Sequence, residues 1–436
     1  MLMNLVCALC CVAAAGGASP SASPAAGELT LSKKAMVFEK DLLRRFTFDG
    51  QVACKMFVPT AAHPQITFNM PDNAYMTGIV LGAFSMKYAV TKDAADRSLA
   101  SDSIRGLNLL CTVSGKRGLL SRAAWPVDKP LDDDGGWGTS ADGKYRWRGD
   151  VSCDQMTGVM FGYALAYDLT ANEAEKGEIA KNVIDLVGVL LDNGLRIIDV
   201  NGKQTQFGNY TPAYVKSAEP MNALLLLQHL QVAAHVTGNA RFAQEYRRWA
   251  VDEGYAETAE RARRMTRRVN FSDDVLLFLA YYPLIKYEKD SGLKERYLKS
   301  LRRTWEGEGT VPGAKAQGNP FYAFVVHELL KDDSGISAGI DTLKWFPLDM
   351  KWNRGTISTY EKEFGFVFNP ESVSPVPKEG EAIPMDRRQK TWSAWVQDPF
   401  REPGDRTADA TLEYNGHDYL VAYWMGRYMG LIAPEM

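Results

Sequence analysis

The sequence contains little cysteine and histidine, and this scarcity argues against several kinds of site. Three of its 6 cysteines, at positions 7, 10 and 11, lie in an apolar run at the N-terminus. The other three, Cys54, Cys111 and Cys153, are scattered, so the sequence predicts no disulfide framework. It also has no HExxH motif, no pair of CxxC motifs and no phosphate-binding glycine loop placed before a helix. We therefore expect no metal and no cofactor.

The chain also lacks a strong charge of either sign and a long hydrophobic run. Its formal net charge is −3 and its pI is about 6.1, which gives no electrostatic footprint for binding nucleic acid. The most apolar internal segment, residues 223–236, is interrupted by two glutamines and two histidines. No stable membrane span is expected after the N-terminus.

The N-terminal residues are typical of an export signal. Residues 5–15 form an apolar run of signal-peptide length, followed by the small-residue stretch GGASPSASPAAG. No lysine or arginine precedes the run, which is unusual for such a signal. We expect residues 1–26 to be a signal peptide and linker, cleavage between Ala15 and Ala26, and an exported protein that is periplasmic or secreted.

The rest of the chain, residues 27–436, reads as one all-α domain of paired helices. Apolar segments alternate with striped ones, and helices that are apolar all round are buried while striped helices lie outside them. The expected inner helices are residues 72–90, 153–169, 220–236, 273–287, 320–330 and 417–431. The expected outer helices are residues 94–113, 173–193, 240–262, 292–306, 337–343 and 31–46. Six such pairs predict an (α/α)6 toroid.

A weak internal repeat supports this arrangement. The segment MTGIVLG at residues 76–82 recurs as MTGVMFG at residues 156–162. Glycines four residues apart lie on one helix face and let a neighbouring helix approach closely, so we interpret them as packing residues.

Two long connections interrupt the helical pattern, at residues 114–152 and 344–416. Both are expected to contribute loops that cover one end of the ring, because structureless loops of this length are unusual in a compact domain. The stretches TYEKEFGFVFN and TWSAWVQ look strand-like and predict a small β-rich insertion within residues 344–416.

The start of each expected inner helix carries more polar and aromatic residues than a helix cap requires. Ser152 and Gln155 fit a capping box, which places Asp154 in the first turn, with Asp150 just before it. If all inner helices run in the same direction, these starts converge on one cleft. For any single start, simple capping is the favoured explanation of the residues. The polar and aromatic residues beyond those that capping requires are the reason to expect a binding site.

The segments GDVSCDQMTGVMFGYALAYDL and PDNAYMTGIVLGA, together with the helix order, resemble the six-hairpin glycosidase architecture of unsaturated glucuronyl hydrolases, other toroidal glycoside hydrolases and sugar epimerases. No particular family is matched. The resemblance implies a carbohydrate substrate, including one that contains uronic acid, and a site at the starts of the inner helices.

Glycoside hydrolysis needs two carboxyl groups, so the expected catalytic residues are Asp154 with Asp150 or Asp72. Guanidinium groups bind carboxylates well, so Arg146 and Arg148 are expected to hold a substrate carboxylate. The remaining substrate-binding candidates are Trp147, Asn73, Asn222, Asp273, Asn319 and His417.

Two alternatives remain open at this stage. A uronate lyase or sugar epimerase on the same scaffold would take its base and its carboxylate neutraliser from Asn209, Tyr210, Tyr214, Arg354 and His417. A non-catalytic toroid would bind a glycan without changing it.

Overall fold

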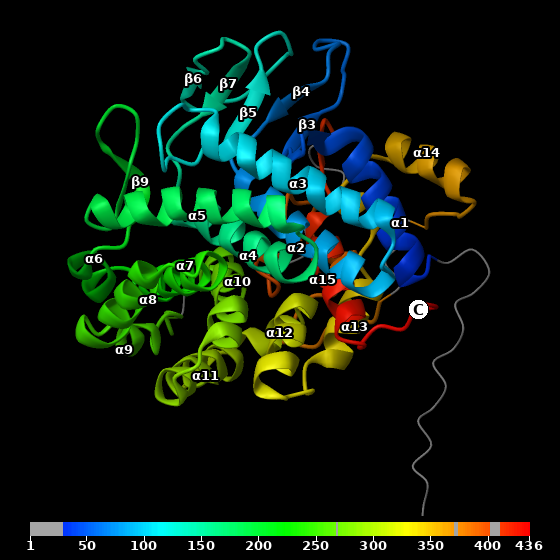
Figure 1. Cartoon of the computed structure of the whole chain (residues 1–436). Coiled ribbons are helices and arrows are strands. Elements are labelled where there is room, and N and C mark those ends of the chain that lie inside the picture. Colours follow the sequence, from blue (N-terminus) through cyan, green and yellow to red (C-terminus); the bar gives the residue numbers. More distant parts are fainter. Residues whose placement is uncertain (1–28, 267–268, 370–373, 402–409) are drawn as a thin grey trace, which may run out of the picture.

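The computed structural model describes residues 29–266, 269–369, 374–401 and 410–436, so the expected signal peptide lies outside the described residues. Its core is a closed ring of six helices, each of which contacts the next, and the last of which contacts the first (Figure 1). In chain order these are α2 (Asn73–Thr91), α4 (Cys153–Leu169), α7 (Met221–Thr237), α10 (Phe271–Tyr287), α12 (Pro320–Leu330) and α15 (His417–Tyr428).

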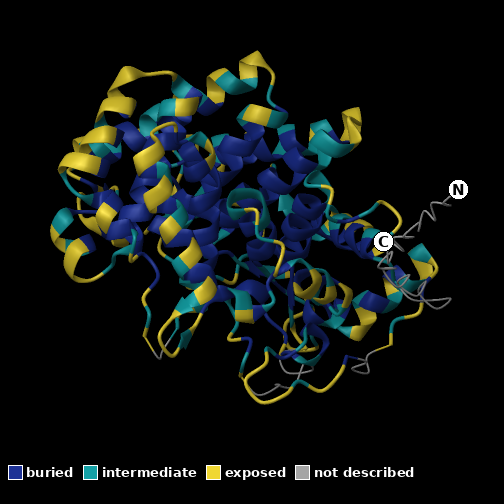
Figure 2. Ribbon diagram, turned by 90° about the horizontal axis from the view of Figure 1, so that it is seen from below, coloured by how far each residue is buried: buried dark blue, intermediate teal, exposed yellow. Residues whose placement is uncertain are grey.

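An outer layer covers this ring. Each outer element packs on a neighbouring inner helix, which confirms the expected (α/α)6 toroid. The layer consists of α1 (Leu31–Asp41), α3 (Ala94–Thr112), α5 (Glu173–Asp192), α8 (Ala240–Arg247), α9 (Tyr255–Ala259), α11 (Ser291–Glu306) and α13 (Ile336–Lys344). The helix expected over residues 240–262 is broken after Arg247, where a π-helical turn (Arg248–Asp252) precedes α9. Figure 2 shows the buried residues gathered in the middle of the molecule.

The repeated glycines bring α2 and α4 into backbone contact. A Cβ added at Gly78 would lie 2.1 Å from the carbonyl oxygen of Gly158, and one added at Gly162 would lie 2.3 Å from that of Gly78. The glycines are therefore packing residues, as predicted. The three cysteines within the described residues are buried and free.

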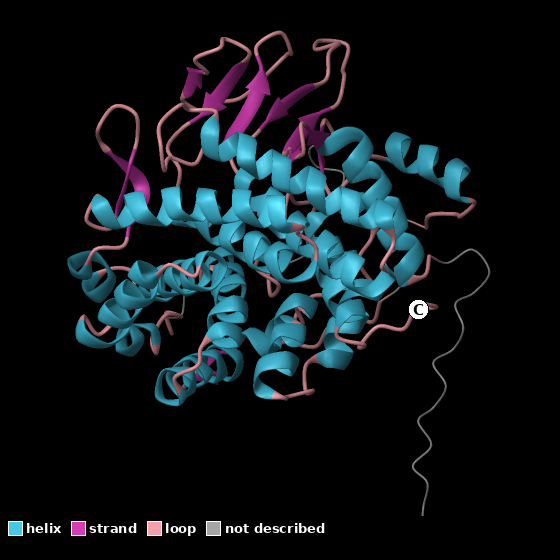
Figure 3. Ribbon diagram, viewed as in Figure 1, coloured by secondary structure: helices cyan, strands magenta, loops and turns pink. Residues whose placement is uncertain are grey.

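The strands are short and gather mostly at one side of the ring (Figure 3). One antiparallel sheet has the order β5–β7–β6 and another the order β12–β3–β4, while β1–β2, β8–β9 and β10–β11 are two-stranded. Their bounds are β1 Thr47–Phe48, β2 Gln51–Val52, β3 Lys55–Phe57, β4 Thr67–Asn69, β5 Ala123–Pro126, β6 Trp137–Thr139, β7 Tyr145–Arg148, β8 Arg196–Ile198, β9 Gln204–Asn209, β10 Gly307–Glu308, β11 Val311–Pro312 and β12 Leu412–Tyr414.

The two long connections differ from each other. Residues 114–152 hold the three-stranded sheet β5–β7–β6. The strand prediction for residues 344–416 is largely wrong, because residues 354–364 form helix α14 (Arg354–Phe364) and Ala394–Val396 is a 3-10 turn. The strand described in this connection is β12, which pairs with β3. Alternation of polar and apolar residues in a short segment does not distinguish a strand from one striped helical turn.

Further short helices complete the described chain. They are α6 (Pro212–Ser217), the π-helical turn Leu42–Phe46 that follows α1, and the 3-10 turns Ala314–Gln317, Leu348–Met350 and Met385–Arg387. Within the described residues, the structure has no helix that is both long enough and apolar enough to cross a membrane.

Candidate active site

The starts of the inner helices lie next to one another around the ring, as the sequence predicts. Gln155 of α4 donates a 2.8 Å hydrogen bond to Asp72, which precedes α2. Asn222 of α7 donates a 3.4 Å hydrogen bond to the Sγ of Cys153 at the start of α4. Gln317, just before α12, donates a 2.6 Å hydrogen bond to Asp274 of α10. Side chains that are distant in the sequence therefore lie together at the end of the ring where the inner helices begin.

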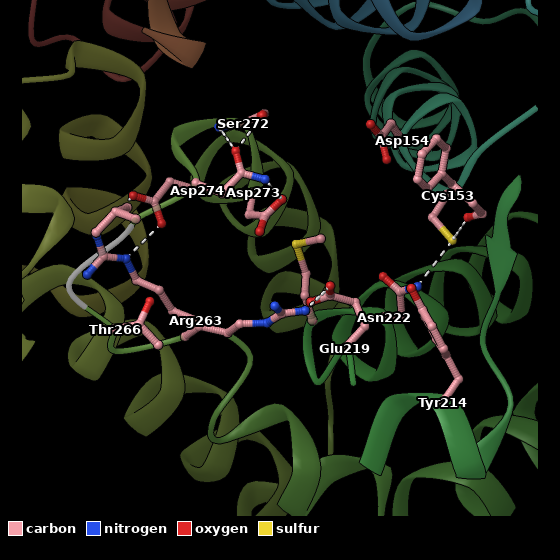
Figure 4. Close-up of a pocket in the computed structure, with 15 residues that line it drawn as sticks. Cys153, Asp154, Tyr214, Glu219, Asn222, Arg263, Thr266, Ser272, Asp273 and Asp274 are labelled. Carbon is pink, nitrogen blue, oxygen red and sulfur yellow. Dashed lines mark hydrogen bonds and ion pairs between the residues drawn. The ribbon is translucent and has the colours of Figure 1, made fainter. Parts of the chain in front are cut away.

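A cavity of about 410 Å³ opens where α4, α7 and α10 begin (Figure 4). This volume is within the range of pockets that bind small molecules. Its lining includes a carboxyl group from the start of each of the three helices, namely Asp154, Glu219 and Asp273. The other lining residues are Cys153, Phe207, Tyr214, Met221, Asn222, Arg263, Arg264, Thr266, Val269, Asn270, Ser272 and Asp274.

Local capping places Asp154 in the cavity wall. Ser152 is the N-cap of α4 and accepts a hydrogen bond from the backbone N–H of Asp154, while Gln155 accepts one from the backbone N–H of Ser152. This is the capping box predicted from the sequence. Gln155 also binds Asp72 through its amide nitrogen, so one side chain both caps α4 and links it to the start of α2.

The surroundings of Asp154 shift the pKa of its carboxyl group toward neutral pH. Burial and the nearby Asp72 carboxylate raise the pKa of Asp154 to about 6, although the guanidinium of Arg122 opposes the shift. Asp154 forms no ion pair among the described residues. A carboxyl group with such a pKa can give or take a proton near neutral pH.

Asp273 faces the same cavity from the start of α10, and its pKa is raised to about 7. The causes are burial first, then repulsion from Glu219 and Asp154, against a smaller opposing effect of Arg264. Asn270, the N-cap of α10, donates a 2.7 Å hydrogen bond to its Oδ1. Figure 4 shows Asp154 and Asp273 on different helices with the cavity between them.

Glu219 completes the group of carboxyls. Its Oε2 forms an ion pair with Arg264, and its Oε1 is buried without a hydrogen-bond partner within the described residues. Burial raises the pKa of Glu219, and Arg264 opposes this. The carboxylate of Glu219, paired with Arg264, repels the charged form of Asp273 and so contributes to the raised pKa of Asp273.

A buried ion pair forms the cavity wall on its other side. Arg263 binds Asp274 through two hydrogen bonds of 2.7 and 3.1 Å, and both side chains are almost fully buried. Arg263 also donates to the carbonyl of Pro312 at 2.9 Å. Since Arg263 balances the charge of Asp274 and Gln317 donates a hydrogen bond to it, Asp274 serves to hold the residues before α10 in place.

Asp72 lies beside the cavity rather than in its lining. Its Oδ1 accepts hydrogen bonds from Gln155 at 2.8 Å and from Arg122 at 3.2 Å. Burial raises the pKa of Asp72, and Arg122 gives the largest opposing effect. Asp72 therefore influences Asp154 through its charge.

The other residues predicted before α4 are engaged elsewhere. Asp150 is exposed, and its Oδ1 accepts a 2.8 Å hydrogen bond from the backbone N–H of Gln206. Arg148 is paired with Asp133 at 2.6 Å, and Arg146 donates to the carbonyl of Lys129 at 2.6 Å. Trp147 is buried in the sheet β5–β7–β6. None of these four residues lines the cavity.

Three further predicted residues are buried at other helix starts. Asn73 accepts a 3.2 Å hydrogen bond from the backbone N–H of Cys54, and Asn319 caps α12. His417 is 1% exposed and shares a 2.7 Å hydrogen bond with Asn415. Burial lowers the pKa of His417 to about 4, so the ring is neutral at pH 7. Of the predicted binding residues, Asn222 and Asp273 line the cavity.

Several lining residues were not among the candidates from the sequence. Arg263 and Arg264 belong to the basic stretch RARRMTRR immediately before α10, and this position beside a helix start was the available signal. Phe207 lies on the β8–β9 hairpin and is 54% exposed, which no periodicity in the sequence indicates. Within the described residues, no group of three or more His, Cys, Asp or Glu side chains is arranged to hold a metal ion.

No protein-family model and no curated protein sequence matches the chain. Among solved structures, the chain is similar to a GH76 α-mannanase from Bacteroides thetaiotaomicron, with 10% identity, a TM-score of 0.48, and 92% of this chain and 94% of that chain covered. It is also similar to an unsaturated glucuronyl hydrolase specific for heparin, with 11% identity, a TM-score of 0.45, and 92% and 96% covered. A third similar structure is cellobiose 2-epimerase from Spirochaeta thermophila, with 10% identity, a TM-score of 0.41, and 92% and 98% covered. An unsaturated glucuronyl hydrolase and a sugar epimerase, two kinds of enzyme that the sequence resembles, are thus among these similar structures.

Proposed function

We propose that the protein is an exported carbohydrate-active enzyme, a glycoside hydrolase that acts at the cavity between the starts of α4, α7 and α10. The observation that carries the proposal is that Asp154 and Asp273, with pKa values raised to about 6 and about 7, line one cavity of about 410 Å³. Glycoside hydrolysis requires one protonated and one ionised carboxyl group on either side of the scissile bond.

The two carboxyls take different roles because their surroundings differ. Asp273 has two acidic neighbours, Glu219 and Asp154, so it keeps its proton to the higher pH and serves as the general acid. Asp154 has Arg122 and its own helix start to stabilise its charge, so it ionises first and serves as the base or nucleophile. The proton of Asp273 passes to the leaving glycosidic oxygen. Asp154 either takes a proton from the attacking water or bonds to the anomeric carbon.

The surroundings of the carboxyls suit a sugar. Asn222, Ser272 and Tyr214 offer uncharged polar groups along the wall, and Phe207 presents an exposed aromatic ring. Sugar hydroxyls require hydrogen-bonding partners, while the apolar face of a sugar ring packs against aromatic rings.

A base-driven lyase or epimerase has less support from the geometry. Tyr210 is fully buried and hydrogen-bonds His229 at 2.9 Å, and His417 is buried beside Asn415. Arg354 is paired with Glu361, and none of the histidines in the described part of the chain lines the cavity. Tyr214, also a candidate for this chemistry, does line the cavity, so the products decide between the two reactions. A lyase would yield unsaturated uronides that absorb in the ultraviolet.

The test is hydrolysis of a panel of nitrophenyl glycosides and nitrophenyl glycuronides, covering both anomers of the common hexoses, by the full chain. We expect Asp154→Asn to lower kcat about 1,000-fold or more on the active nitrophenyl substrate, with an unchanged circular dichroism spectrum. Asp273→Asn is expected to lower kcat about as much on the matching methyl glycoside, whose alkoxide leaving group must be protonated, and much less on the nitrophenyl glycoside. The matched control is Asp93→Asn, at the exposed N-cap of α3, because asparagine caps a helix as well as aspartate. Wild-type activity in both cavity variants would overturn the assignment. Glycan binding without cleavage of any panel member would favour a binding protein.

A further inference from the structure

A second cavity adjoins the first on the far side of the loop before α10. It has a volume of about 380 Å³, close to the 410 Å³ of the first. The two share Arg263, Thr266 and Val269 as lining residues, so the cavities adjoin and these residues contribute to the wall of each. Nothing in the proposed acid–base chemistry uses the second cavity.

The lining of the second cavity combines aromatic and polar groups. Phe271, the first residue of α10, and Phe400 lie with ring centroids 6.4 Å apart and planes tilted by 49°, and both are half-buried. Val311 and Pro312 of the β10–β11 hairpin add apolar surface, while Thr310 and Asp398 add polar groups at the edge. Aromatic rings with a few polar groups around them are the usual lining of a site for a small polar ligand with an apolar face.

The wall between the cavities is fixed in place. The Arg263 guanidinium is bound by Asp274 and by the carbonyl of Pro312, and Arg303 donates a 2.9 Å hydrogen bond to the carbonyl of Arg263. Gln317, which lines the second cavity, donates to Asp274, whose neighbour Asp273 lines the first. Arg263, which lines both cavities, is therefore anchored by residues of α10, β11 and α11.

We propose that the second cavity is a binding subsite for a further sugar unit of the same substrate, so that the protein acts on oligosaccharides rather than on single glycosides. This inference rests on the proposed function. A unit cleaved beside Asp154 and Asp273 leaves its neighbour in the chain next to Phe271 and Phe400. Binding energy from that neighbour then contributes to turnover of the longer substrate.

The test compares nitrophenyl glycosides of one, two and three sugar units, built from whichever sugar the panel shows to be cleaved. We expect kcat/KM to rise at least 10-fold on lengthening the substrate from one unit to two or three. Phe400→Ala is expected to lower kcat/KM about 10-fold for the longer substrates and less than 2-fold for the single glycoside. Phe207→Ala is the matched control, because Phe207 lines the first cavity and its loss lowers kcat/KM for substrates of every length.

The outcomes separate the two proposals. If no substrate of any length is cleaved, the proposed function fails, and the subsite fails with it. If single and longer substrates are cleaved equally well, or if Phe400→Ala affects them equally, the subsite is overturned while hydrolysis stands. Val367→Ala, at a 74% exposed side chain, shows the change to expect from a substitution outside both cavities.

Discussion

The starts of α10 and α15 carry the same kinds of residue, yet they differ in what surrounds the aspartate. Asp418 of α15 is fully buried and forms a 2.6 Å ion pair with Lys351, which is also fully buried. Its Oδ2 also accepts a 2.6 Å hydrogen bond from the backbone N–H of Ala394. Asp273 of α10 forms no ion pair among the described residues and faces a cavity. An aspartate at a helix start is structural where a cation reaches it, and is available for chemistry where none does.

The difference comes from the connection of residues 344–416. It brings Lys351 and Ala394 to Asp418, and its Trp395 donates a 2.9 Å hydrogen bond to the Asp418 carbonyl. On the other side of the ring the connections are shorter and leave the starts of α4, α7 and α10 open to the cavity. The sequence predicted that the starts of all six inner helices line one open cleft. In the structure, the starts of three of them, α4, α7 and α10, line the cavity.

Replacing the buried aspartate should have the largest effect. Asp418→Asn leaves the Lys351 ammonium buried without a counterion, and we expect the free energy of unfolding at pH 7 to fall by about 3–5 kcal/mol. Urea denaturation followed by circular dichroism measures this. The double variant Asp418→Asn/Lys351→Met removes both charges and is expected to recover part of the loss. A cost below about 1 kcal/mol for the single variant would mean that Asp418 is not a structural aspartate.

Asp273→Asn should have a smaller effect on the free energy of unfolding, and of the opposite sign. The pKa of Asp273 is raised from 3.8 to about 7 in the folded state, so the folded protein binds the proton more tightly than the unfolded chain does. Its contribution to stability is therefore present below pH 4 and is lost as pH rises to 7. Asp273→Asn cannot ionise, and we expect it to be about 1–2 kcal/mol more stable than wild type at pH 8, after allowing for solvent in the cavity.

The pH dependence is the critical part of that measurement. The stability difference between Asp273→Asn and wild type should shrink as the pH is lowered toward 4, whereas Asp93→Asn should differ little from wild type at any pH in this range. A destabilised Asp273→Asn at pH 8 would show that this carboxylate is needed for folding and would remove the contrast with Asp418.

The contrast between Asp418 and Asp273 also shows how much of the structure can be predicted from the sequence alone. Apolar and striped segments predicted the ring because burial of whole helices depends on local periodicity, and the glycine repeat predicted the contact of α2 with α4. The capping box predicted where Asp154 lies. The sequence could not show that Lys351 reaches Asp418, because the two lie 67 positions apart and meet only through the path of an irregular connection. For the same reason Arg148, beside Asp154 in sequence, points to Asp133.

Substitution of Glu219 offers the finest test, because it changes the charge beside Asp273 without removing either carboxyl of the proposed acid–base pair. Glu219→Gln removes a repulsion that raises the pKa of Asp273, and it frees Arg264, whose charge lowers that pKa. Both effects act in the same direction, so the general acid loses its proton at lower pH. We expect the basic limb of the pH profile of kcat to move down by about 0.5–1 pH unit, while kcat at the optimum changes only a few-fold. Glu257→Gln, which makes the same change in net charge on the exposed surface of α9, should leave the limb where it is. A limb that stays in place or moves up in Glu219→Gln would mean that Asp273 does not supply the proton, and would transfer that role to Asp154.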